Sequence, residues 1–231
     1  MADRFYTIDG KDLPSVTSIL NVIDKPWLGP WQKKELAAAM KTELLVKNLP
    51  KDKLKRIDVL DEMIKQAKKV PNLIGKQAME LGTKIHSQIE KLSLGEGENV
   101  ETDEDTKIGV ASWKLWKQES GMEIVETERL VYDKENGYAG TADAIFKDSF
   151  NRLYIIDYKT SSSGIVSDSY ALQIAAYAGA YPDIIHGGFV LMLDKNQPNF
   201  KIHKVDLFES YKAFIAALEL YKRLKGGKLW M

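Results

Sequence analysis

The sequence predicts an α/β fold, with a central mixed sheet flanked by helices and a mostly helical N-terminal part. Helical patterns come first, followed by three strands, a helix, two strands and a helix, an order typical of a layered domain. The clearest strand pattern, Leu153–Thr160, is rich in β-branched and aromatic residues. The closing segment, Phe208–Lys225, has the apolar spacing of an amphipathic helix.

The N-terminal part is expected to extend to residue 80. It begins with a short strand and turn at residues 5–10, and Ser15 is a candidate N-cap for the short helix that follows. Trp27 and Trp31 flank a Gly-Pro turn. Helical patterns then cover residues 32–47, 51–69 and, after Pro71, 73–92.

The remaining residues, 81–231, carry the strands. A polar, acidic loop at 95–105 precedes them. The expected order is a helix at 106–119, strands at 123–132, 138–146 and 153–160, a helix at 168–181, strands at 188–193 and 200–207, and the closing helix. This arrangement predicts one layered domain with a helical extension.

Composition excludes several classes of protein. The 231 residues are 44% hydrophobic, which is enough to build a core. The absence of cysteine excludes a disulfide framework, a thiolate zinc site and an iron–sulfur cluster. No apolar run is long enough to span a bilayer and no signal-peptide pattern is present, so we expect a cytoplasmic protein without a membrane partner.

The zero net charge hides a segregation of charge. Residues 41–79 contain ten basic and five acidic side chains, whereas residues 80–148 contain eight basic and sixteen acidic ones. A basic region beside an acidic one suits a protein that holds a phosphate backbone with one part and metal ions with the other. The alternative is two ordinary solvated faces.

The strand Leu153–Thr160 ends in charge. Asp157 and Lys159 are two residues apart, so their side chains point to the same face of the sheet. Burying both groups is unfavourable unless something binds them. The simplest interpretation is a salt bridge on an edge strand.

A second acid favours a different interpretation. The preceding strand contains Gly140–Asp143, and residues 148–152 have the composition of a turn. A hairpin centred near Phe150 places Asp143 roughly opposite Asp157. Two adjacent carboxylates repel each other, and a divalent cation bound between them would remove the conflict.

Two further residues are candidates for the same site. His86 lies at the margin of an apolar helical stripe, one turn after Gly82, which would allow a close approach to that helix. A neutral imidazole is a common metal ligand, although a half-buried core histidine is the simpler explanation. On the strand before Asp143, either Glu126 or Glu128 could join the acids, and we prefer Glu128.

The helix after the charged strand carries Gln173 and Tyr177, one turn apart on a side that is rich in tyrosine. A tyrosine stripe is usually packing. A buried glutamine amide needs hydrogen-bond partners, so Gln173 could instead bond a phosphate or a backbone group near the site.

Taken in order, these pieces resemble the PD-(D/E)XK nuclease superfamily and, within it, the RecB-like exonucleases. The matching segments are Gly82–His86, Glu128, Gly140–Asp143, Asp157–Thr160 and Gln173–Tyr177. The segment Leu13–Leu20 is also similar to mitochondrial genome maintenance exonucleases and their viral and bacterial relatives. Because the chain lacks cysteine, the resemblance is to members without an iron–sulfur cluster.

The resemblance implies a restriction-endonuclease-like core at residues 81–231. We expect the mostly helical part at 1–80, with its basic residues, to grip DNA. The implied metal ligands for one or two Mg²⁺ or Mn²⁺ ions are His86, Asp143, Asp157 and the Tyr158 carbonyl. The implied catalytic residues are Asp143, Asp157, Lys159 and Glu128, with Lys159 orienting water. The expected DNA-binding residues are Gln173, Tyr177, Lys53, Lys55 and Arg56.

The function expected on this basis is a metal-dependent DNA exonuclease that hydrolyses phosphodiester bonds in recombination, repair or replication-end processing. Its expected substrates are single strands or duplex ends, and a bacterial or viral source fits. Two alternatives remain open at this stage: an endonuclease of the same fold, and a non-catalytic subunit that binds nucleic acid. Polarity, the choice between DNA and RNA, and oligomeric state stay open.

Overall fold

The computed structural model describes residues 3–23, 28–47, 57–96, 103–161 and 166–226. The chain divides into two compact units, one formed by Met1–Ile23 with Gly82–Met231 and the other by Asp24–Leu81. Residues 3–23, which the sequence places with the helical part, belong to the sheet unit in the structure, where Ser15 forms a parallel β-bridge with Ala139.

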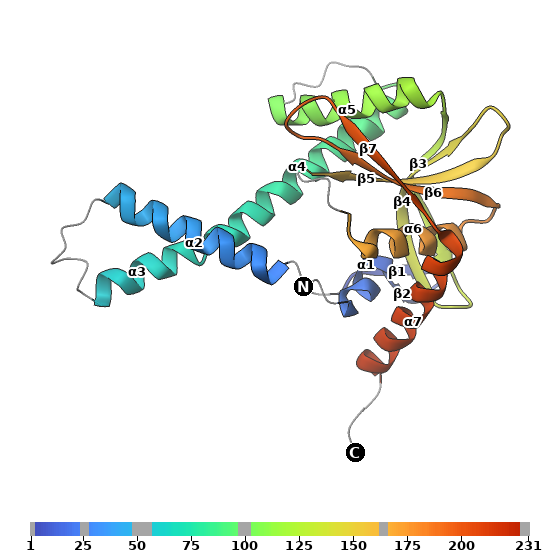
Figure 1. Ribbon diagram of the computed structural model, residues 1–231. Coiled ribbons are helices and arrows are strands. Elements are labelled where there is room, and N and C mark those ends of the chain that lie inside the picture. The colour runs from blue at the N-terminus through green and yellow to red at the C-terminus, as the bar shows by residue number, and fades with distance from the viewer. Residues whose placement is uncertain (1–2, 24–27, 48–56, 97–102, 162–165, 227–231) are drawn as a thin grey trace. The chain divides into compact units, whose positions relative to one another are not determined.

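A five-stranded mixed sheet forms the centre of the larger unit (Figure 1), in the order β3-β4-β5-β6-β7. Its strands are β3 (Glu123–Asp133), β4 (Tyr138–Lys147), β5 (Leu153–Thr160), β6 (Ile185–Leu193) and β7 (Phe200–Val205). Only β5 and β6 pair in parallel, because the helix α6 (Asp168–Ala180) connects them as a crossover. The predicted central mixed sheet is confirmed.

Helices cover both faces of this sheet, as predicted (Figure 1). On one face lie α5 (Glu104–Ser120) and the Gly82–Ser93 part of α4 (Val70–Ser93). These helices pack closely because Gly109 has no Cβ to overlap with Ile85. On the other face, α6 packs beside α7 (Leu207–Gly226), and their buried side chains share one apolar core with β4, β5 and β6.

The N-terminus forms a hairpin rather than a single strand and turn. Strand β1 (Phe5–Ile8) is the predicted one, and β2 (Lys11–Pro14), which was not predicted, pairs with it in antiparallel fashion. Asp9 and Gly10 have φ values of 48° and 76° between the strands, as a tight hairpin requires. The Ser15 N-cap is confirmed, because its hydroxyl accepts the Ser18 N–H at 3.0 Å in front of α1 (Val16–Ile19). The 3₁₀ helix η1 (Leu20–Val22) follows.

The smaller unit contains α2 (Leu28–Lys47), α3 (Ile57–Ala67) and the first part of α4. Two predicted boundaries were wrong. Pro30 lies in the first turn of α2 rather than in a turn before it, and Pro71 lies in the first turn of α4. Both positions tolerate proline, because the first N–H groups of a helix have no intrahelical partner.

Among the described residues, no helix combines the length and apolar character needed to cross a bilayer.

We predict that Gly140→Ala destabilises the protein by about 1–3 kcal/mol, because a Cβ at this position would overlap with the buried Tyr177 ring. Gly75→Ala on α4 is the matched control, since its Cβ would meet open space and should add about 0.5–1 kcal/mol of helix stability. Urea unfolding of both variants measures the difference. Equal stabilities would contradict the packing described for Tyr177.

Candidate metal centre

The hairpin of β4 and β5 brings two acids together near the middle of the sheet. Its paired residues run from Lys147 with Leu153 to Ala144 with Ile156, so Asp143 and Asp157 occupy the next position on each strand. The Tyr158 N–H donates to Asp143 Oδ2 at 2.7 Å. This is the placement expected from the sequence, and β5 is the central strand rather than an edge strand.

Asp157 is a carboxylate buried in the sheet, with 1% of its surface exposed. It forms an ion pair with Lys159, whose side chain is 22% exposed. Apart from that ion pair, neither oxygen of Asp157 has a hydrogen-bond partner among the described residues. Burial raises the pKa of Asp157, Lys159 opposes the rise, and the charge of Asp143 adds to it. The predicted salt bridge therefore exists, but it leaves the carboxylate poorly satisfied.

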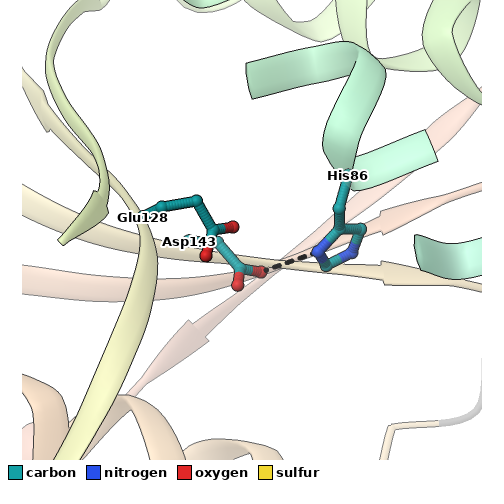
Figure 2. Close-up of side chains that lie close together, drawn as sticks. All are labelled: His86, Glu128 and Asp143. Carbon is teal, nitrogen blue, oxygen red and sulfur yellow. Dashed lines mark ion pairs between the residues drawn. The ribbon is translucent and has the colours of Figure 1, made fainter. Parts of the chain in front are cut away.

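His86 reaches the acids from α4. Its Nδ1 lies 3.6 Å from Asp143 Oδ2 (Figure 2). The imidazole also meets the Tyr158 ring edge-on, with centroids 5.7 Å apart, and the Tyr158 hydroxyl accepts a hydrogen bond from Trp113 Nε1 at 3.3 Å. These contacts fix the orientation of the imidazole.

The close approach expected at Gly82 is present. A Cβ on this residue would lie 3.3 Å from Thr160 Oγ1 at the end of β5. The absence of a side chain at Gly82 thus allows α4 to run close to the strand that carries Asp157 and Lys159. One turn later, the same helix presents His86 to the acids.

Glu128 joins the group through an unusual backbone conformation. Its neighbours on β3, Thr127 and Arg129, pair with β4, whereas Glu128 itself is unpaired opposite Asp143. Its φ is 47°, a left-handed value that costs a non-glycine residue about 1–3 kcal/mol. Glu126 instead forms an ion pair with Arg129 at 3.3 Å.

Three side chains therefore converge on one point. His86, Glu128 and Asp143 each offer a ligand atom, and these atoms lie within 4.8 Å of one another (Figure 2). Strict alternation could not separate Glu126 from Glu128. A register shift between Ile124 and Glu126, together with the left-handed conformation of Glu128, determines which of the two acids faces the other side chains of the group.

The electrostatic environment of Glu128 includes two residues that the sequence analysis missed. Partial burial raises its pKa to about 7, and the charges of Asp143 and Glu90 add to the rise, whereas Arg4 opposes it. Glu90 lies one turn after His86 on α4, and the i, i+4 spacing was the available signal. Nothing in the sequence pattern placed Arg4 nearby.

The residues expected to bind DNA divide into two groups. On α6, Gln173 Nε2 donates to the Tyr177 hydroxyl at 3.0 Å. Tyr177 is only 3% exposed and packs over Gly140, while Gln173 is half-buried. The expected residues Lys53, Lys55 and Arg56 lie outside the described part of the chain.

This donor set fits a hard divalent cation. Carboxylate oxygens are the ligands that Mg²⁺ prefers, and Mn²⁺ also accepts an imidazole nitrogen. Beside this group, the oxygens of Asp157 have no hydrogen-bond partner among the described residues apart from the Lys159 ion pair, and a bound cation would compensate for the burial of this carboxylate.

The chain matches no family model and none of the curated proteins. One similar solved structure is that of SSO0001, at 18% identity and a TM-score of 0.33, covering 54% of this chain and 60% of that one. Another is the alkaline exonuclease LHK-Exo from Laribacter hongkongensis, at 14% identity and a TM-score of 0.35, covering 62% of this chain and 82% of that one.

We predict that Glu128 makes the metal-free protein less stable as the pH rises from 4.5 to about 7. Its pKa is 4.5 in the ordinary state and about 7 in the folded state. The folded protein therefore binds more protons than the unfolded chain in this window, and stability falls with pH. Glu128→Gln should gain stability relative to wild type across the window.

Urea unfolding in EDTA at several pH values tests this prediction. The control is Glu119→Gln, which removes one exposed carboxylate from α5. A pH-independent difference between wild type and Glu128→Gln would show that Glu128 is not held in this environment.

Proposed function

We propose that the protein is a divalent-metal-dependent DNA exonuclease of the RecB-like type. The observation that carries this proposal is the buried Asp157 carboxylate, which lies in the central strand. In the described part of the chain it has no hydrogen-bond partner beyond the Lys159 ion pair. The convergence of His86, Glu128 and Asp143 supports it, as does the ordered set of motifs in the sequence.

The proposed ligands for one or two Mg²⁺ or Mn²⁺ ions are His86, Asp143, Asp157 and the Tyr158 carbonyl. A bound divalent cation would lower the pKa of a water molecule and stabilise charge on the phosphodiester. Within the site, Tyr158 N–H fixes one oxygen of Asp143. The raised pKa of Glu128 makes this residue a candidate to accept a proton near neutral pH.

Lys159 is proposed to orient the attacking water and to offset negative charge in the transition state. Its ammonium group is held by the ion pair with Asp157 and lies 5.1 Å from the centroid of the Tyr170 ring. A cation fixed in this way needs little reorganisation during the reaction. It cannot ligate a metal ion, so its contribution is separable from metal binding.

The proposed substrate is DNA, as a single strand or a duplex end, processed in recombination, repair or replication. Gln173 is the better candidate of the α6 pair for contacting the strand, since Tyr177 is buried beneath it. Lys53, Lys55 and Arg56 are proposed to bind the phosphate backbone. The exonuclease assignment itself depends on the family resemblance.

The decisive experiment is digestion of DNA labelled at the 5′ or the 3′ end, in single- and double-stranded form, with Mg²⁺, Mn²⁺ or EDTA. Mononucleotide release from one end that requires metal supports the proposal. Cleavage of circular single-stranded DNA would indicate an endonuclease. Metal-independent binding without cleavage of any substrate would overturn the enzymatic assignment.

We predict that Asp143→Asn abolishes cleavage and the stabilisation by Mn²⁺ together. At a Mn²⁺ concentration of about 100 Kd, the wild type should gain roughly 5–10 °C in melting temperature. The variant should show no gain, yet be slightly more stable than wild type in EDTA, because one of two repelling carboxylates is gone. If Mn²⁺ does not stabilise the wild type, the metal-site assignment is wrong.

We predict that Lys159→Ala lowers turnover by roughly 10²–10³-fold while Mn²⁺ affinity changes little. Calorimetric titration with Mn²⁺ and single-turnover cleavage measure the two quantities. Lys212→Ala on α7, which removes an exposed lysine paired with Glu209, is the control. Near-normal turnover of Lys159→Ala would reduce Lys159 to a structural salt bridge.

A further inference from the structure

The N-terminal hairpin is attached to the strand that carries Asp143. The hydroxyl groups of Tyr6 and Thr141 are hydrogen-bonded at 3.0 Å, and Thr141 precedes Asp143 by two residues on β4. The parallel bridge between Ser15 and Ala139 attaches the same segment to β4 a second time. Residues at the start of the chain are thereby fixed beside the candidate metal centre.

The backbone of Arg4 is held firmly in this arrangement. Its N–H donates to Ser18 Oγ at 2.8 Å, and its carbonyl accepts the Ser15 N–H at 2.8 Å. Both serines are buried, with 2% of the surface of Ser15 and 4% of that of Ser18 exposed. The backbone position of Arg4 is therefore well defined, and its side chain is exposed.

Among the described residues, no carboxylate forms an ion pair with the Arg4 guanidinium. It lies 4.8 Å from the centroid of the Tyr6 ring. Every other arginine in the described part of the chain forms an ion pair: Arg129 with Glu126, Arg152 with Asp148, and Arg223 with Glu219. Arg4 thus keeps an unneutralised charge on a fixed aromatic support.

This charge lies beside the strand that carries Asp143. The Tyr6 ring, whose centroid is 4.8 Å from the Arg4 guanidinium, is attached through its hydroxyl to Thr141, two residues before Asp143. The carboxylates of Glu128, Asp143 and Asp157 repel a phosphate backbone. A nearby cation with N–H groups that are free to donate would offset this repulsion and favour phosphate binding. The planar guanidinium presents paired N–H donors that match phosphate oxygens.

We propose that Arg4, supported by Tyr6, binds a DNA phosphate next to the one that is cleaved. This inference rests on the proposed nuclease function and adds a substrate-binding residue to it. The competing explanation is that Arg4 only offsets the negative charge of the acidic cluster. A lysine at position 4 would preserve that charge but lose the bidentate geometry, so it separates the two explanations.

The test compares Arg4→Gln and Arg4→Lys with Arg223→Gln, which removes an exposed arginine from α7. Steady-state cleavage of a single-stranded oligonucleotide in Mg²⁺ gives kcat and KM. Fluorescence anisotropy at several salt concentrations, in the Asp143→Asn background, gives binding without cleavage. Each measurement uses oligonucleotides with a 5′-phosphate and with a 5′-hydroxyl.

We expect Arg4→Gln to raise KM roughly tenfold with little change in kcat. Its log–log salt slope should fall by about 0.7, the value for one lost contact to a single strand. Arg4→Lys should retain the slope but bind less tightly than wild type. An effect on both oligonucleotides indicates an internal phosphate, and an effect confined to the 5′-phosphorylated one indicates a terminal phosphate.

Two results would overturn the inference. If Arg4→Gln matches Arg223→Gln in KM and salt slope while wild type cleaves DNA, the phosphate site is wrong and the nuclease proposal stands. If Arg4→Lys equals wild type in KM and binding, Arg4 acts only by its charge. A wild type that neither binds nor cleaves DNA removes both proposals.

Discussion

The buried carboxylate of Asp157 is the constraint on which the site depends. A charge in the central strand of a sheet is unfavourable unless it is paired and hydrogen-bonded. Lys159 supplies one partner, but the oxygens of Asp157 remain short of hydrogen bonds and Asp143 adds repulsion. The core around this position is otherwise apolar, and a cation bound there would offset the unfavourable burial of the charge.

The backbone strain at Glu128 adds a second unfavourable contribution at the same place. Its left-handed conformation is held by paired neighbours on both sides and by the register shift before Glu126. The result is a carboxylate with a raised pKa beside two others. A cation between the acids would offset both the strain and the repulsion, so the metal-free protein would be less stable than the metal-bound one.

The sequence predicted those features that depend on local pattern. Strand β5 was predicted with its observed boundaries, and the turn at residues 148–152 was sufficient to place Asp143 opposite Asp157. The Ser15 cap is also local. Periodicity could not predict the left-handed Glu128, because a bulge and a positive φ break the alternation of side chains along β3.

Non-local contacts account for most of what was missed. Arg4 reaches the site only because Ser15 pairs with Ala139, far along the chain, and Glu90 becomes relevant only when α4 lies against β5. The first 23 residues join the sheet unit for the same reason. None of these contacts leaves a pattern within a short window of sequence.

Two cations near the acids are supported by tyrosine rings, and the difference between them is informative. Lys159 lies over Tyr170 but is also paired with Asp157, so much of its charge already stabilises a buried group. Arg4 lies over Tyr6 and has no ion pair among the described residues. An aromatic face positions a cation without neutralising it. The two positive charges are therefore suited to different tasks: Lys159 to the centre of the site, and Arg4 to an anion that arrives from outside.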